Sequence, residues 1–172
     1  MMNSIREIVT KAVVGKGKKL IKLKEKIKPQ YSPNSILGCL VINHRFEAKR
    51  IDEFVEITGS FELNVWYSHD DYLKTSVAKE TVEYSEKIKI VPIVSEVDQA
   101  KDVIVKMVQQ PTCLDGIITL DMVELDIVFE TSIDVIGEAK ISISILDRTD
   151  IWPDDFDIDN SVDENFIKEK EN

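Results

Sequence analysis

The chain has 172 residues, which suits one domain with a buried core and excludes two large domains. Its 32 acidic and 22 basic residues give a formal net charge of −10, which disfavours partners such as nucleic acid and acidic lipid surfaces. The longest uncharged apolar run, residues 36–42, is far shorter than the roughly 20 residues of a spanning helix, so no membrane span is expected. Charges interrupt the N-terminal apolar positions, which argues against a secretory signal and predicts a cytoplasmic protein.

The N-terminal segment carries the one clear helix signal of the chain. Ser4 and Glu7 match a capping box, and the sequence therefore predicts a short helix over residues 4–13. A second, shorter helix is predicted around residues 46–53.

A basic stretch follows, in which apolar residues alternate with lysines. This period of two predicts a strand with one lysine-coated face, here called the lysine strip: Lys18, Lys19, Lys22, Lys24, Lys26 and Lys28. One interpretation is an edge strand whose lysines prevent unwanted edge pairing. The other is a docking strip for an acidic partner. The strip has no interleaved aromatic residues, so nucleic-acid binding is not expected.

Alternation of period two continues through most of the body and predicts an all-β sandwich. Gly59 falls inside one alternating series, whose apolar residues have odd numbers on both sides of the glycine. A two-residue hairpin loop would pair odd with even positions, so the sequence favours one long strand bent at the glycine. Strands are predicted at residues 36–43, 55–67, 75–84, 87–91, 103–108, 117–120, 123–129 and 139–146.

A gapless shift of 78 residues aligns prolines and glycines in the two halves of the body. It superposes Pro33 on Pro111 and Gly59 on Gly137. The alignment predicts two similar β units, at about 19–68 and 97–146, with a hairpin at 75–91 inserted between them.

The last 26 residues, 147–172, hold ten acidic and three basic residues, and no sustained apolar period. We predict a β-rich assembly domain at 1–146 and a disordered, acidic-hydrophobic tail at 147–172. One interpretation is a tail that only adds solubility. Its aspartates lack the pattern of a calcium loop, so weak, non-specific cation binding is the most that they predict. The other interpretation is a tail that orders on a client protein. Its candidate contact residues are Trp152, Asp154, Asp155, Phe156, Asp157 and Asp159.

No phosphate loop, nucleophile elbow or zinc-protease motif occurs, and we predict neither catalytic residues nor a cofactor or metal site. Cys39 and Cys113 lie in apolar contexts, and with His44 and His69 they form no zinc-like spacing. Reduced core thiols are favoured over a disulfide.

An alternative function starts from Trp66, Tyr67 and Tyr72. Together they would give a soluble β-sandwich module a platform for a small ligand or carbohydrate. Packing at a strand end is the other interpretation of the same residues.

Several segments are specific enough as a set to suggest a family. The chain resembles the CotE family of outer spore-coat morphogenetic proteins from endospore-forming bacteria. The resemblance covers roughly residues 5–146, with the segments in the same order, and the expected acidic tail follows. The segments are Arg6–Lys18, Ser35–Gly38 with Val41–His44, Asn64–Ser68 and Val108–Leu114.

The resemblance implies a non-enzymatic scaffold that assembles around the forespore and recruits outer spore-coat proteins. It implies a homo-oligomer, made in the mother-cell cytoplasm, positioned by a coat base-layer ATPase and using its acidic C-terminal region to engage clients. Two departures stand out: the tail is less densely acidic than the family pattern, and Cys39 replaces a small residue.

Overall fold

The computed structural model describes residues 4–94, 100 and 102–145, and these residues form strands and turns without a helix. The all-β prediction is therefore confirmed. The strands are β1 (Ser4–Ile27), β2 (Ser35–Ile51), β3 (Phe54–His69), β4 (Lys74–Lys89), β5 (Val91–Pro92), β6 (Asp102–Thr119) and β7 (Met122–Ile145).

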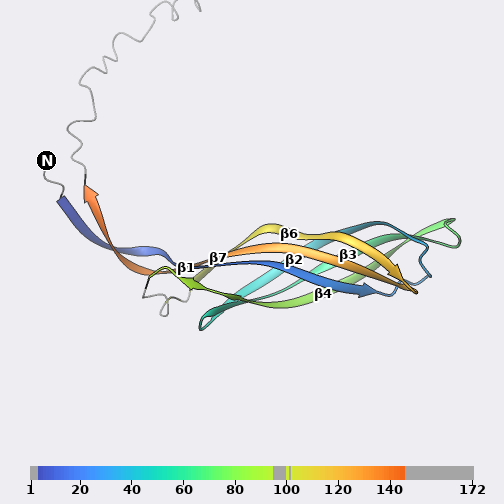
Figure 1. Ribbon diagram of the computed structural model, residues 1–172, viewed down its shortest axis with the longest axis horizontal. Helices are drawn as coiled ribbons and strands as arrows, with labels where there is room; N and C mark the ends of the chain where they lie inside the picture. Colours follow the sequence, from blue (N-terminus) through green and yellow to red (C-terminus); the bar gives the residue numbers. More distant parts are fainter. Residues whose placement is uncertain (1–3, 95–99, 101, 146–172) are drawn as a thin grey trace, which may run out of the picture. The chain divides into compact units, whose positions relative to one another are not determined.

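The strands build two sheets that pack as a sandwich (Figure 1). One sheet has the order β5-β1-β7-β6 and the other the order β2-β3-β4. Tight turns connect the antiparallel neighbours, and Asp52, Asp70 and Leu120 adopt positive φ in them. Aspartate tolerates this conformation better than leucine does, because its short polar side chain can bond to the local backbone.

The core lies between the sheets and follows the alternation of the sequence. On β3 the odd-numbered side chains Val55, Ile57, Phe61, Leu63 and Val65 are buried, and their even-numbered neighbours are more exposed over most of the strand. β7 contributes a matching inner row. Apolar burial of this kind supplies the main favourable free energy of folding.

The predicted helices at 4–13 and 46–53 are wrong. Residues 4–13 belong to β1, and residues 46–51 continue β2 up to the turn at Asp52. A capping box contributes only about 1 kcal/mol, whereas the neighbouring β7 offers β1 a hydrogen-bonded ladder. Long-range pairing therefore outweighs the local signal.

The predicted insertion of a hairpin at 75–91 is also wrong, because residues 74–89 are one strand paired with β3 along its whole length. The two proposed repeat units are not equivalent strand for strand. A shift of 78 residues would carry the Asp52 turn into the middle of β7 and the Leu120 turn into the middle of β2.

Gly59 lies inside one uninterrupted strand, as predicted. The irregularity near it is in the partner strand β2, where the register shifts between Ile42 and Arg45 and Asn43 has φ of 54°. A Cβ on Gly59 would lie 2.6 Å from the Arg45 carbonyl oxygen and 2.6 Å from the Tyr84 hydroxyl. Glycine therefore admits the Tyr84 ring from β4.

The chain divides into two compact units. Val9–Lys140 form one, which contains the sandwich core. The described part of the other consists of the first residues of β1 and the last residues of β7, and its isoleucines Ile5, Ile141 and Ile143 are exposed.

Candidate assembly surfaces

The lysine strip lies on β1 as the alternation predicted, except for Lys28, which directly follows the strand. Ile21 and Ile27 point into the core and are nearly fully buried, whereas the even-numbered lysines are exposed. β5 pairs with β1 only at Gly15 and Lys16. Beyond these two residues, among the residues described, β1 has a ladder partner on one side only and forms an edge of the four-stranded sheet. β1 therefore has the predicted position at a sheet edge, and both interpretations of its lysines are compatible with that position.

Half of the strip is already paired with carboxylates of the neighbouring strand β7. The ion pairs are Lys18 with Glu130 (2.9 Å), Lys24 with Asp126 (3.2 Å) and Lys26 with Glu124 (2.8 Å). The lysine side chains in these pairs remain largely exposed, so each pair contributes only a few tenths of a kcal/mol to about 1 kcal/mol. An incoming carboxylate could therefore displace them at small cost.

Lys19 is oriented differently from the other lysines. Its Nζ contacts Glu86 of β4 at 2.6 Å and donates to the carbonyl oxygen of Lys87 at 3.3 Å. Lys22 and Lys28 are exposed and form no ion pair with the part of the chain that the structure describes. These two lysines are the most available cations of the strip.

A hollow of about 230 Å³ lies over the strip. It is lined from β1 by Lys24 and Lys26, from β7 by Glu124 and Asp126, and from β6 by Asp115 and Ile117, among others. Charges of both signs therefore surround it. The tail residues predicted to contact clients, 152–159, lie outside the described residues.

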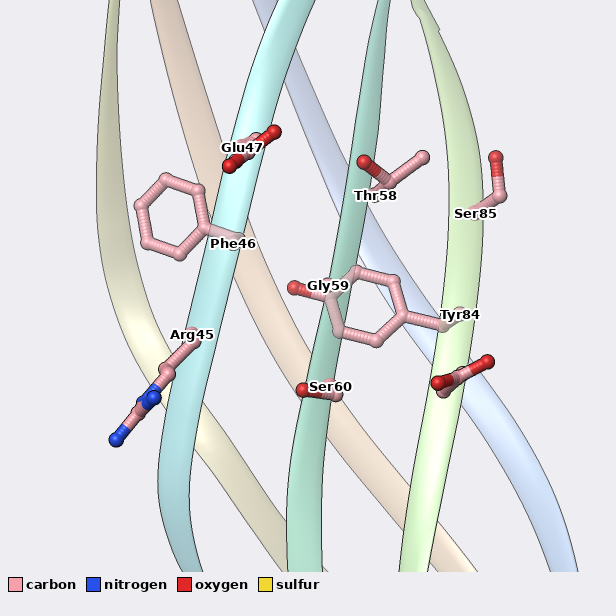
Figure 2. Close-up of a pocket in the computed structure, with 9 residues that line it drawn as sticks. Arg45, Phe46, Glu47, Thr58, Gly59, Ser60, Tyr84 and Ser85 are labelled. Atoms are coloured by element: carbon pink, nitrogen blue, oxygen red, sulfur yellow. The ribbon is translucent and has the colours of Figure 1, made fainter.

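A larger, shallow hollow of about 670 Å³ covers the three-stranded sheet at Gly59 (Figure 2). The central cross-strand row Phe46, Gly59 and Tyr84 turns its rings toward the core. The rows on either side are polar, namely Arg45, Ser60 and Glu83, and Glu47, Thr58 and Ser85. The sequence did not predict this hollow, because its residues come from β2, β3 and β4 and only the pairing register of these strands brings them together.

His44 and Tyr84 form a hydrogen-bonded pair beneath this hollow. The His44 Nδ1–H donates to Gln110 Oε1 (3.2 Å), so Nε2 accepts from the Tyr84 hydroxyl (2.6 Å). Burial lowers the pKa of His44, although the bond to Gln110 opposes this effect. Burial also raises the pKa of Tyr84 to about 12. Both groups are therefore uncharged at neutral pH.

The proposed aromatic platform is contradicted by the strand geometry. Tyr67 is buried at 1% exposure, and its hydroxyl accepts from the Tyr31 backbone N–H. Trp66, its neighbour on β3, points to the opposite face, and Tyr72 lies in the β3–β4 turn. The three rings cannot form one surface.

The cysteines and histidines do not pair as a nucleophile and base in the described part of the chain. His69 contacts Asp70 and Ser76, and Cys39 interacts with Cys113 instead. Between Ser4 and Ile145, wherever residues are described, no cluster of potential metal ligands occurs. Nor do these residues include a helix of the length and apolar character that crossing a bilayer requires.

The β7 and β4 carboxylates that neutralise the strip were missed at the sequence level. Glu124, Asp126 and Glu130 all occupy even positions of an alternating strand, so they could have been assigned to one face. That this face lies beside β1 follows only from the sheet order.

Comparison with known proteins gives one match. Neither the curated proteins nor the solved structures contain a match to this chain. The family model described as "Outer spore coat protein E (CotE)" matches residues 4–172. The match covers nearly the entire sequence, and the chain belongs to the CotE family of outer spore coat proteins.

Proposed function

We propose that this outer-coat protein is a non-enzymatic morphogenetic scaffold, which self-assembles around the forespore and recruits other outer spore-coat proteins. It is made in the mother-cell cytoplasm and is positioned by a coat base-layer ATPase. The observation that carries the proposal is the lysine strip: an outward row of cations at a sheet edge, with Lys22 and Lys28 lacking an ion pair in the described chain.

Complementary charge on the same chain supports a head-to-tail contact. Residues 147–172 hold ten acidic and three basic residues, with Trp152 and Phe156 among them. A strip on one copy that receives the tail of another is a heterologous contact, and such contacts produce extended assemblies when they do not close into rings. The same tail, with its acidic and aromatic residues, engages client proteins.

The test compares the full-length protein with strip variants by light scattering coupled to size exclusion. At about 50 mM salt large assemblies are expected, and at about 500 mM they should dissociate because screening weakens exposed charge contacts. Lys22→Gln with Lys28→Gln should reduce the assembled fraction several-fold. Lys49→Gln with Lys106→Gln removes the same charge from exposed positions of β2 and β6 and should leave assembly intact.

A second variant ends at residue 146 and removes the acidic tail. It should lose salt-dependent assembly and the capture of outer-coat clients together. If assembly and capture both survive this truncation, the contact between strip and tail is wrong. A salt-independent monomer in every condition would contradict self-assembly in solution.

A further inference from the structure

Strands β2 and β6 lie side by side in opposite directions where the edges of the two sheets meet, here called the β2–β6 seam. Two contacts fix their alignment. A Cβ on Gly116 would lie 3.0 Å from Ile36 Cδ1, and His44 Nδ1 bonds Gln110 Oε1 at 3.2 Å. Residue numbers therefore rise along β2 as they fall along β6.

The two cysteines of the chain occupy matching places in this seam. Cys39 lies three residues after Ile36, and Cys113 lies three residues before Gly116. Antiparallel alignment consequently places the cysteines opposite one another. Residues 74 positions apart in the sequence thus become neighbours.

Both cysteines also face the core. Cys39 pairs across β2 and β3 with Val65, and Cys113 pairs across β6 and β7 with Ile127; both of these partners are buried. Residues directly opposite one another in a ladder share a face of the sheet. The two thiols are free and half-buried at the rim of the core, and Cys113 interacts with the Cys39 thiol.

The surroundings keep the Cys39 thiol protonated. Burial, followed by the interaction with Cys113, raises the pKa of Cys39 to about 12. A thiol rather than a thiolate is the resting form at neutral pH, so exchange chemistry at Cys39 is slow rather than forbidden.

We propose that Cys39 and Cys113 are the site of an intrachain disulfide that locks the β2–β6 seam when the protein meets a small-molecule disulfide. One cysteine thiolate attacks a sulfur of the oxidant and releases one small thiol, which leaves a mixed disulfide. The second cysteine then attacks the protein sulfur of that mixed disulfide and releases the second small thiol. The two cysteines lose two electrons and two protons, and the oxidant is reduced to two thiols.

The cross-link is independent of the proposed assembly function. It joins the edge of the four-stranded sheet to the edge of the three-stranded sheet and closes a long loop of chain. A loop of this length restricts the unfolded chain strongly, so the melting temperature should rise by roughly 5–15 °C.

The experiment incubates the full-length protein with oxidised glutathione at pH 8.5, then blocks remaining thiols and denatures the sample. Mass spectrometry should find a monomer that has lost two hydrogens and a peptide in which Cys39 is bonded to Cys113. The melting temperature should rise as stated and return to its starting value with dithiothreitol.

Cys39→Ala and Cys113→Ala are the matched controls. Each single variant should take up one glutathione on the remaining cysteine without the rise in melting temperature. The proposal fails if the wild-type monomer also ends as a glutathione adduct with no internal bond. It fails equally if oxidation links cysteines of different chains, which covalent dimers on a non-reducing gel would reveal.

Discussion

The two seams between the sheets are chemically different. At the β2–β6 seam the contacts are thiol with thiol, imidazole with amide, and isoleucine against glycine. At the opposite side β1 meets β4, here called the β1–β4 seam, and the contacts there include charged side chains besides the apolar approach of Ile88 to Gly17. Lys19 bonds Glu86, and Glu25 lies near Glu80. Burial, followed by the charge of Glu80, raises the pKa of Glu25.

Because of this difference, different solution conditions should weaken each seam. Uncharged, half-buried contacts are little affected by salt, whereas exposed ion pairs weaken as screening increases. The β2–β6 seam should therefore respond to oxidation and to extremes of pH, and the β1–β4 seam to ionic strength. Self-assembly by charge would involve the face next to the salt-sensitive seam.

The largest loss of stability should come from Gly59→Ala, which disturbs the β2–β6 seam through Tyr84 and His44. The added Cβ would lie 2.6 Å from the backbone oxygen of Arg45 and would push the Tyr84 ring away from His44. Overpacking of this kind should cost about 3 kcal/mol in the free energy of unfolding, measured by urea denaturation. Gly38→Ala is the control, because a Cβ there meets no atom within 4 Å. Equal effects of the two changes would refute this reasoning.

Tyr84→Phe should weaken the support of His44, a residue of the same seam, more gently. It removes the donor to His44 Nε2 and should cost about 1 kcal/mol near neutral pH. Because the pKa of Tyr84 is raised to about 12, its stabilisation is present below pH 10 and is lost as pH rises toward 12. Urea denaturation at pH 9 and pH 11 should therefore show a steeper loss for wild type than for the variant. Parallel losses would contradict a buried, protonated Tyr84.

The strands and the lysine face of this chain could be predicted from sequence, because period two reports directly which side chains are buried. The prediction of one continuous strand through Gly59 was correct for the same reason, although the irregularity lies in the partner strand β2. The helix prediction for residues 4–13 was wrong because Ser4 and Glu7 match the start of a helix. The strand β7, whose pairing with β1 decides the conformation, comes more than 100 residues later in the sequence.

The seams themselves could not be predicted. No local pattern tells which strand lies beside β2, so neither the approach of Cys39 to Cys113 nor the bond from His44 to Gln110 was expected. The ion pairs of the lysine strip were missed on the same grounds. Alternation assigns a residue to a face of its sheet, and only the order of the strands determines what that face meets.

Lys19→Met tests the salt sensitivity of the β1–β4 seam. It keeps most of the apolar stem and removes the ion pair with Glu86, so the free energy of unfolding should fall by about 0.5–1 kcal/mol at low salt. The deficit should shrink at 500 mM salt. Lys24→Met removes a more exposed pair and should change stability by less. A deficit that is independent of salt would mean that lost packing, rather than charge, explains the effect.

Glu25→Gln should strengthen the same seam slightly. Burial, followed by repulsion from Glu80, raises the pKa of Glu25, so folding penalises its charged form. A raised pKa gives full stability at acidic pH, where Glu25 is protonated, and a loss as pH rises through the folded pKa. At pH 7 the neutral glutamine should therefore add about 0.3–0.5 kcal/mol to the free energy of unfolding, a small gain because solvent screens this half-exposed group.

Glu80→Gln should give part of the same gain by removing the repelling charge. The gain should disappear near pH 3, and urea denaturation at both pH values would show whether it does. A gain that persisted there would have to come from packing, since Glu25 is then uncharged in wild type as well.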